Sequence, residues 1–293
     1  MKAGRAGTAG TRDPGPGSRK SEASGRDEAA AFAVSGSRVS GPGFTGQQAQ
    51  SDQVAAPGSS GSRVAGPGSR LPRLNLYYGG TFDPIHLGHL AIACAARDEW
   101  DACVHLVPAA DPPHRAVPGA TAEQRARMLE LALAGQAGLV LDARELQRAS
   151  ADGVPSYTVD TLRELRAEIG PQTPIAWLLG ADAFVALSRW HQWQALFGLA
   201  HFVIAARPGT TLDLSAAPEL AAAVQARWAA HADELTTAPA GRLWRLRQPL
   251  RGESASAVRS RIASGARWQA LVPAAVADFI AQHGLYGCAR PAS

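Results

Sequence analysis

An apolar run that ends in two glycines constrains the fold of this chain more than any other sequence feature. The run spans residues 74–78, Gly79 and Gly80 follow it, and apolar residues then recur with helical spacing over residues 87–98. A strand, a glycine turn and a helix in this order form the first unit of a parallel sheet. The sequence therefore predicts an α/β fold from about residue 74 onward.

The same alternation continues to the end of the chain. Strand patterns at residues 103–107, 139–142, 175–179 and 201–205 are interleaved with helical patterns at 121–133, 158–169, 254–262 and 273–283. Thr121 and Gln124 form a capping-box pattern, and Gly284 stands where a helix C-cap is expected. We therefore predict a doubly wound parallel sheet with a Rossmann-like fold, in which ligands bind at the carboxyl ends of the strands where the strand order reverses.

The first 72 residues have a different composition, dominated by Gly, Ser, Ala, Arg and Pro. They contain a near-repeat, because SGSRVSGPG at residues 35–43 returns as SGSRVAGPG at residues 60–68. So few large apolar side chains cannot offset the conformational entropy of ordering the segment. We expect residues 1–72 to be a disordered extension and residues 73–293 to form one domain. The alternatives are a start codon that lies downstream, a basic arm for an acidic partner, or a transit peptide.

Most of the net positive charge lies in this extension. The chain has 29 basic and 25 acidic residues, of which ten and five fall within residues 1–73. The remaining domain is close to neutral, so a nucleic-acid partner is not expected. No apolar run approaches the length of a membrane span, and the N-terminus lacks a signal-peptide pattern. The sequence predicts a cytoplasmic protein.

The three cysteines do not predict a disulfide framework or a zinc site. Cys94, Cys103 and Cys288 are an odd number and form no CxxC pair. Such cysteines are typical of a reducing compartment, and the apolar runs around Cys94 and Cys103 indicate core positions.

The segment GGTFDPIHLGH, residues 79–89, follows the first strand at its carboxyl end. Its glycines let the backbone approach a ligand, and the N–H groups of a turn and a helix start favour a phosphate. His86 and His89 share one helical face, so both can donate hydrogen bonds to one polyphosphate. By itself such a pair also fits an ordinary surface feature or a metal site, although no third zinc ligand stands nearby.

With one more residue the segment reads GGTFDPIHLGHL, which resembles the nucleotide-binding signature of the HxGH nucleotidyltransferases, and in particular of bacterial nicotinate-mononucleotide adenylyltransferases. Further blocks resemble that family in the same order: PPHR at 112–115, SYTVDTL at 156–162, GAD at 180–182, Trp190, RPG at 207–209 and SASAVR at 254–259. The resemblance covers residues 74–287. It implies transfer of the adenylyl group of ATP to nicotinate mononucleotide, giving nicotinate adenine dinucleotide and pyrophosphate in NAD biosynthesis.

The resemblance also implies roles for individual residues. His89 would contact the α-phosphate, His86 the β- or γ-phosphate, and Arg259 the triphosphate. The implied ATP-binding residues are Gly80, Thr81, Phe82, Gly180, Asp182, Arg207, Ser254 and Ser256. The implied substrate-binding residues are Arg115, Tyr157, Thr158 and Trp190. The structural alternatives are helix N-caps for Ser254 and Asp182, core packing for Trp190 and a solvated side chain for Arg115.

Two residues depart from the family pattern. Glu253 replaces an apolar residue, and we expect its side chain to point into solvent. Ser256 replaces a threonine and keeps the hydroxyl. The resemblance implies Mg²⁺ as the cofactor, bound mainly through ATP phosphates, because Mg²⁺ keeps most of its waters and needs few protein ligands.

Three other readings of the sequence are less well supported. Pantetheine-phosphate or glycerol-phosphate nucleotidyltransferases share the histidine pair but not the SYT block and Trp190. A nucleotide sensor without catalysis would not need to retain His89 and Arg259. A nucleic-acid-binding protein would act through the basic extension. The sequence is compatible with a monomer or a homo-oligomer.

Overall fold

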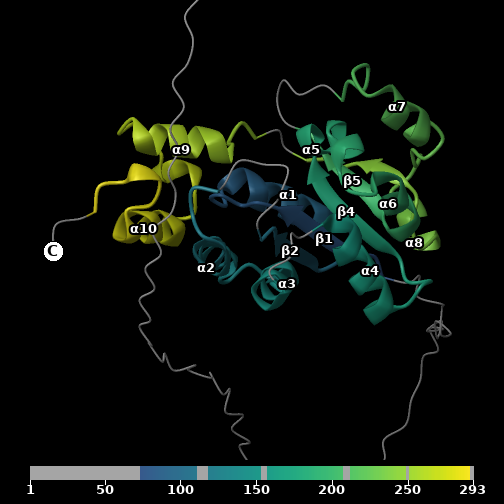
Figure 1. The fold of residues 1–293 in the computed structure, drawn as a ribbon, viewed down its shortest axis with the longest axis horizontal. Helices are drawn as coiled ribbons and strands as arrows, with labels where there is room; N and C mark the ends of the chain where they lie inside the picture. Colours follow the sequence, from purple (N-terminus) through teal and green to yellow (C-terminus); the bar gives the residue numbers. More distant parts are fainter. Residues whose placement is uncertain (1–72, 111–117, 153–156, 207–211, 249–250, 291–293) are drawn as a thin grey trace, which may run out of the picture. The chain divides into compact units, whose positions relative to one another are not determined.

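The computed structural model describes residues 73–110, 118–152, 157–206, 212–248 and 251–290, without the side chains of 151–152. The predicted extension at residues 1–72 lies outside this part, as do Arg115 and Arg207. Within it, one sheet of parallel strands has the order β3-β2-β1-β4-β5-β6 (Figure 1). The strands are β1 (Asn75–Gly80), β2 (Val104–Pro108), β3 (Leu139–Leu141), β4 (Ile175–Gly180), β5 (His201–Ala205) and β6 (Leu243–Arg245).

The strand order reverses between β1 and β4. From β1 the chain moves outward through β2 to β3, then crosses back to β4 and continues through β5 to β6. Tyr77 of β1 pairs with Trp177 of β4, so the two strands are direct neighbours in register. This confirms the predicted doubly wound sheet and places its topological switch point between β1 and β4.

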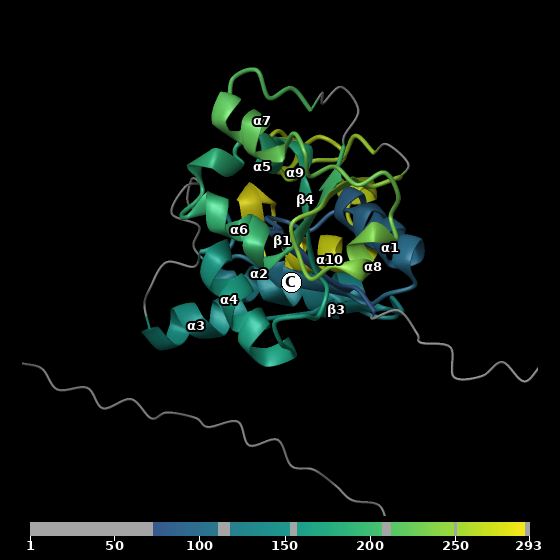
Figure 2. The ribbon, with the colours of Figure 1, turned by 90° about the vertical axis from the view of Figure 1, so that its right-hand side faces the viewer.

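Helices cover both faces of the sheet. They are α1 (Leu87–Trp100), α2 (Ala122–Leu133), α3 (Arg144–Asp152), α4 (Thr158–Ile169), α5 (Ala181–Val185), α6 (Trp193–Leu199), α7 (Pro218–Val224), α8 (Glu234–Thr237), α9 (Ala255–Ala263) and α10 (Ala274–His283), with short 3₁₀ turns η1 (Leu187–Arg189), η2 (Gln269–Leu271) and η3 (Leu285–Gly287). Helices α4 and α6 lie on one side of the strands and α1 and α8 on the other (Figure 2). Within the described ranges, no helix combines the length and the apolar character needed to cross a membrane.

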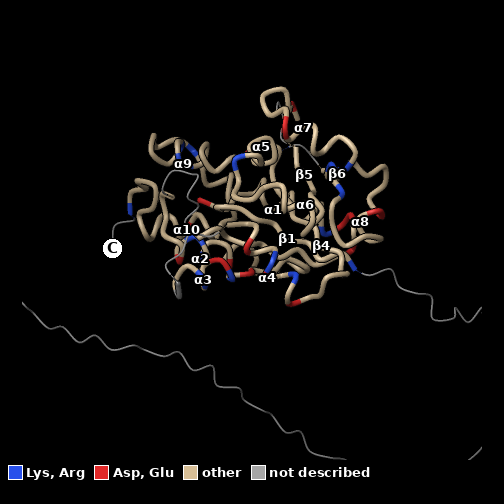
Figure 3. The backbone as a smooth tube through the Cα atoms, turned by 45° about the vertical axis from the view of Figure 1, so that its right-hand side comes forward, with Lys and Arg blue, Asp and Glu red and all other residues tan. Residues whose placement is uncertain are grey.

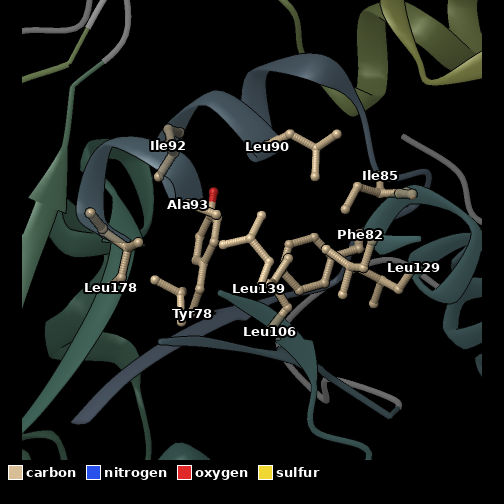
Figure 4. Packing of buried hydrophobic residues seen from close by; sticks show 14 of the residues in the cluster. Tyr78, Phe82, Ile85, Leu90, Ile92, Ala93, Leu106, Leu129, Leu139 and Leu178 are labelled. Atoms are coloured by element: carbon tan, nitrogen blue, oxygen red, sulfur yellow. The ribbon is translucent and has the colours of Figure 1, made fainter. Parts of the chain in front are cut away.

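One core cluster joins α1, α2, α9 and α10 to the sheet. Figure 4 shows Leu90 and Ile92 of α1 above the strands, while Phe82 and Ile85 of the β1–α1 loop point into the same cluster beside Leu129 of α2. The Phe82 ring meets Tyr78 edge-on, with ring centroids 5.4 Å apart. The loop that follows β1 is therefore anchored by its own buried side chains, since buried aromatic side chains contribute large contact areas.

The two glycines of β1 belong to the strand, whereas the sequence predicted a turn at this point. A Cβ added at Gly79 would lie 2.2 Å from Cζ2 of Trp177, and one at Gly80 would lie 2.9 Å from the Phe82 ring. These glycines are needed because large side chains pack directly against the main chain. Neither has a positive φ.

The predicted helix and strand boundaries differ from the observed ones by only a few residues. Helix α4 and strand β5 have the predicted bounds. The capping box at Thr121 is confirmed, because its Oγ1 accepts from the Gln124 N–H (3.3 Å) and its own N–H donates to Gln124 Oε1 (2.9 Å). Gly284 caps α10 with a φ of 62°. The core prediction for Cys103 is wrong: its side chain is exposed just before β2.

Acidic and basic positions lie next to one another around α2, α3 and α4 (Figure 3). Arg144 of α3 pairs with Glu168 of α4 at 2.9 Å, and Arg148 pairs with Glu164 at 2.6 Å. These ion pairs hold α3 against α4, whose first turn carries the predicted substrate-binding residues.

Candidate active site

A cavity of about 660 Å³ opens at the carboxyl ends of β1 and β4, next to the switch point. The lining comes from the end of β1 and the turn after it, His89 of α1, residues 118–119, residues 180–190 and α9 with its N-cap. Ten of the predicted site residues line it: Gly80, Thr81, Phe82, His89, Gly180, Asp182, Trp190, Ser254, Ser256 and Arg259. The fold thus gathers residues that are up to 179 positions apart (Gly80 to Arg259) around one space.

The turn after β1 presents its main chain to this cavity. Phe82 has a φ of 49°, in the left-handed region that non-glycine residues rarely adopt. Its side chain is buried, with the ring 5.0 Å from that of His89. Since the side chain points into the core, the main-chain groups of the turn are left to face a ligand.

The two histidines are stacked, with ring centroids 3.7 Å apart and planes 25° from parallel. The main-chain N–H of His86 donates to Nδ1 of His89 at 3.3 Å, so in the neutral ring the proton of His89 resides on Nε2. His89 lines the cavity, whereas His86 is only 1% exposed and lies behind it. A direct contact of His86 with phosphate therefore stays a prediction.

The first turn of α9 presents two hydroxyls. Ser254 is its N-cap, because Ser254 Oγ accepts from the Ala257 N–H at 3.1 Å. The Oγ atoms of Ser254 and Ser256 are 3.3 Å apart, and both residues line the cavity. The capping role and a role in binding are thus compatible, since helix N-termini attract anions.

Asp182 and Trp190 line the cavity from the segment that follows β4. Gly180 is the N-cap of α5, so the N-cap alternative for Asp182 is wrong; Asp182 is exposed in the first helical turn. Trp190 is half-buried and lines the cavity, while Trp193 is buried in the core. Trp190 also packs against the core cluster that contains Trp193, so core packing and a place in the cavity wall both hold for Trp190.

The described lining does not include Tyr157 or Thr158, which begin α4. The Tyr157 ring contacts that of His191, with centroids 4.6 Å apart, and His191 directly follows Trp190. The first N–H groups of a helix have no acceptor within the helix, so the start of α4 offers donors near this aromatic group.

The sequence did not predict a role for Arg125. In the structure its side chain is fully buried, at 0% exposure. Its Nη1 donates to the carbonyls of Thr81 (2.9 Å) and Ala109 (2.5 Å), and its Nη2 donates to the carbonyl of Ala110. Arg125 thereby ties the turn after β1 to the end of β2. The sequence feature that could have identified it is its spacing. Arg125 stands three and four residues before the buried Met128 and Leu129, and therefore on the core-facing side of α2.

Asp83 and Tyr286 were also missed. Asp83 lines the cavity, and its carboxylate is 2.7 Å from the Tyr286 hydroxyl. The main-chain oxygen of Asp83 accepts from Arg259 at 2.6 Å. These residues connect the turn after β1 to the last elements of the chain.

The expectation that Glu253 points into solvent is wrong. Its side chain is 14% exposed, and Oε1 lies 2.5 Å from Nη2 of Arg251. The hydrogen bond from Arg251 lowers the pKa of Glu253 below its ordinary value. Its carboxylate is thus paired and covered beside α9.

The described residues contain no group of three His, Cys, Asp or Glu side chains that could hold a metal ion. Of the two carboxylates in the lining, that of Asp83 already accepts two main-chain N–H groups and a hydroxyl. Such a lining suits an ion held by ligand oxygens and water more than a metal held in a protein cage.

A parallel sheet with a cavity at its switch point, and with a histidine, two hydroxyls and an arginine around it, defines a nucleotidyltransferase of the cytidylyltransferase-like class. The family model described as "Cytidylyltransferase-like" matches residues 77–261.

Comparison with known proteins narrows the class to a family. A protein of Stenotrophomonas maltophilia (strain K279a) named "Probable nicotinate-nucleotide adenylyltransferase" is 62% identical over 219 residues, 74% of this chain and 99% of the relative. One of the same name from Xylella fastidiosa (strain M12) is 51% identical over 217 residues, 74% of this chain and 98% of the relative. The chain belongs to the nicotinate-nucleotide adenylyltransferase family.

The fold is also found in a solved structure of low sequence identity. The structure "Plasmodium falciparum nicotinic acid mononucleotide adenylyltransferase complexed with NaAD" matches with a TM-score of 0.56 at 16% identity, over 74% of this chain and 98% of that chain. At this identity the likeness shows the fold alone.

Proposed function

We propose that this chain transfers the adenylyl group of ATP to nicotinate mononucleotide, forming nicotinate adenine dinucleotide and pyrophosphate. The observation that carries the proposal is the convergence of His89, the start of α9 and Trp190 on one cavity at the switch point. Membership of the nicotinate-nucleotide adenylyltransferase family supports the choice of substrates.

The reaction needs no covalent enzyme intermediate. A phosphate oxygen of the mononucleotide attacks the α-phosphorus of ATP, a new P–O bond forms, and the bond to the oxygen that bridges the α- and β-phosphates breaks. Both electrons of the broken bond leave with pyrophosphate. Catalysis then consists of positioning two anions and stabilising charge on the transferring group.

We assign the charge stabilisation to His89, the turn after β1 and α9. The Nε2–H of His89 donates to an oxygen of the α-phosphate, and the main chain of Gly80, Thr81 and Phe82 surrounds the phosphates. Ser254, Ser256 and Arg259 hold the leaving pyrophosphate at the N-terminus of α9, where a helix dipole and a guanidinium favour anions. His86 supports the ring of His89 from behind.

We assign the adenosine to Gly180 and Asp182, whose carboxylate accepts from ribose hydroxyls. Trp190 stacks on the pyridine ring, and the N–H groups at the start of α4, around Tyr157 and Thr158, bind the carboxylate. Neutral donors suit a carboxylate better than a carboxamide, because the NH₂ of a carboxamide would face another donor. Arg115 and Arg207 remain proposed contacts to the mononucleotide phosphate and to ATP, outside the described residues.

Mg²⁺ fits the site as an ion bound mainly by ATP oxygens and water, where it would neutralise charge on the phosphates. The ion needs neither carboxylate of the described lining, because Asp182 is assigned to the ribose and Asp83 already accepts from its own donors. The protein residues orient the phosphates rather than enclose the metal.

The test is a steady-state assay of the purified protein with ATP and either nicotinate or nicotinamide mononucleotide, following pyrophosphate release and dinucleotide formation. We expect kcat/KM to be at least about tenfold higher for nicotinate mononucleotide, the factor expected for one unmatched buried donor. Absence of dinucleotide with both substrates contradicts the proposed reaction, whereas equal efficiencies contradict only the proposed carboxylate pocket.

We further propose that residues 73–293 form the complete catalytic domain and that residues 1–72 are dispensable. The described elements begin at Asn75, and the relatives match about three quarters of this chain over nearly their whole length. A protein that begins at Pro72 should keep full activity and melt at the same temperature as the full chain; a clear drop in either contradicts the proposal. We propose the cytoplasm as the compartment, which the free cysteines Cys94, Cys103 and Cys288 favour. We propose no nucleic-acid partner, because the residues outside the extension are close to neutral.

A further inference from the structure

The carboxylate of Asp83 joins three segments that are far apart in the sequence. Oδ2 accepts from the Gly119 N–H at 2.8 Å, and Oδ1 accepts from the Ala120 N–H at 3.1 Å and from the Tyr286 hydroxyl at 2.7 Å. Asp83 is 5% exposed. A buried carboxylate is tolerated only when hydrogen bonds replace its lost hydration, so each of these donors matters for its position.

Tyr286 is held in place by its main chain and by its ring. It has a φ of 58°, in the left-handed region, within η3. A Cβ at Gly119 would lie 2.9 Å from Cδ1 and Cε1 of the ring, so the ring packs directly on this glycine. Strained conformations persist where the surroundings over-determine them, and they concentrate at functional sites.

The hydroxyl of Tyr286 acts as a donor in this arrangement. Burial, and then the negative charge of Asp83, raise the pKa of Tyr286 far above its ordinary value. The phenol therefore keeps its proton, and its O–H donates a hydrogen bond to the carboxylate of Asp83.

The same aspartate also touches Arg259. Arg259 Nη1 donates to the main-chain oxygen of Asp83 at 2.6 Å and lies 3.6 Å from its Oδ2. This contact uses one end of a guanidinium that has five N–H donors, and 39% of the side chain remains exposed. Arg259 can thus hold a phosphate in the cavity while Asp83 fixes its orientation.

We propose that Asp83 and Tyr286 are positioning residues that hold Arg259 at the triphosphate end of the cavity. The hydroxyl of Tyr286 holds the carboxylate of Asp83 in place by a hydrogen bond. The carboxylate in turn holds the turn at residue 83, whose main-chain oxygen orients the Arg259 guanidinium. The element that follows α10 thereby becomes part of the ATP site without touching ATP. The inference rests on one part of the proposed function, the binding of the ATP triphosphate by Arg259.

The test measures binding of a non-hydrolysable ATP analogue by calorimetry, which requires no acceptor substrate. Tyr286→Phe keeps the ring and removes the hydroxyl, and we expect about tenfold weaker analogue binding with little change in melting temperature. In the assay, KM for ATP should rise while KM for the mononucleotide stays within about twofold of its wild-type value. The matched control is Tyr77→Phe, which removes a hydroxyl from a buried tyrosine outside the described cavity lining and should leave binding unchanged.

A double-mutant cycle separates positioning from a general loss of packing. If Tyr286 acts through Arg259, Tyr286→Phe should weaken analogue binding by less than about twofold in an Arg259→Ala background. An undiminished tenfold effect in that background, or wild-type binding by the single variant, overturns the inference. Should Tyr286→Phe fail to fold, Asp83→Asn takes its place in the same cycle.

The outcomes distinguish the two proposals. If the wild-type protein binds the analogue but forms no dinucleotide, the proposed reaction is contradicted and the inference about Arg259 is not. If the wild-type protein forms dinucleotide and the Tyr286→Phe variant binds the analogue as tightly as the wild-type protein does, only the inference is contradicted. Failure of the wild-type protein to bind the analogue counts against both.

Discussion

The main-chain N–H of His86 and the Nδ1 atom of His89 are 3.3 Å apart, and the two rings stack over each other. The first contact places the proton of the neutral His89 ring on Nε2, and the second, together with ring contacts from Tyr78 and Phe82, orients the ring. His86 thus contributes to both the chemistry and the orientation of the ring that lines the cavity.

His89→Ala should lower kcat by at least about a hundredfold, because removal of one donor aimed at the transition state commonly costs this much. The melting temperature and turnover of the purified variant are the measurements. His231→Ala, at an exposed histidine outside the described lining, is the control and should turn over normally. Near-normal turnover by folded His89→Ala contradicts the role assigned to His89.

Arg125→Met should destabilise the protein by about 3 kcal/mol or more, because three carbonyls near the site lose a donor at a cost of about 1 kcal/mol or more each. Urea unfolding measures this loss. Arg127→Met on the same helix is the control: that arginine is 56% exposed and pairs with Glu130 at the surface, so its loss should cost under about 1 kcal/mol. Equal losses for the two variants would mean that the buried hydrogen bonds of Arg125 contribute no net stability.

Gly79→Ala should destabilise the protein by about 1 to 3 kcal/mol, because the new Cβ would overlap Trp177. In a Trp177→Phe background the same glycine substitution should cost less free energy of unfolding than it does in the wild-type protein. The smaller ring leaves room for the new Cβ. Gly198→Ala in α6 meets no atom within 4 Å and should be neutral or stabilising by up to about 1 kcal/mol. Thermal unfolding of the four variants checks the prediction, and an undisturbed Gly79→Ala protein contradicts it.

His201 should make the stability depend on pH. Its Nδ1 accepts from the Arg242 N–H at 3.0 Å and its Nε2 lies 2.8 Å from the Ala238 carbonyl, an arrangement that requires the neutral ring. Burial lowers the pKa of His201 below its ordinary value of 6.5. Below pH 6.5 the unfolded chain therefore takes up a proton more readily than the folded one, and stability is lost as the pH falls.

The measurement compares the wild-type protein with His201→Asn, whose amide does not titrate. The advantage of the wild-type protein in free energy of unfolding should be constant above about pH 7.5 and shrink as the pH falls toward about 5. His105, whose pKa burial also lowers, is present in both proteins and cancels in the difference. A difference that does not change with pH rules out the assigned titration.

The sequence predicted the elements whose patterns are long or bounded by strong signals. Helix α4 shows a full helical period, and the capping box of α2 fixes its start, so both were predicted correctly. Helices α6 and α7 have seven residues each, which is too short for a helical period to emerge, and strand β6, with three residues, was also not predicted. Their positions depend on contacts with the sheet.

The site was predictable where a motif carries the chemistry and unpredictable where the fold brings distant residues together. The glycine and histidine positions of residues 79–89 were singled out from local patterns, and the site residues at the start of α9 from the resemblance to the family. Asp83 is in the same motif, yet its partners Gly119 and Tyr286 are 36 and 203 positions away, and nothing local indicates such pairs. Arg125 was missed because a charged residue on a core face is the exception to burial rules.

The hydrogen bond between Asp83 and Tyr286 has a consequence for the order of events during folding. It spans 203 positions, and contacts of such separation require the chain to close a large loop, so they form slowly compared with local ones. The first strand–helix units can collapse before η3 docks, and in such an intermediate Arg259 has no anchor. Nucleotide affinity should therefore appear after secondary structure during refolding, and ATP should stabilise only the fully docked state by mass action.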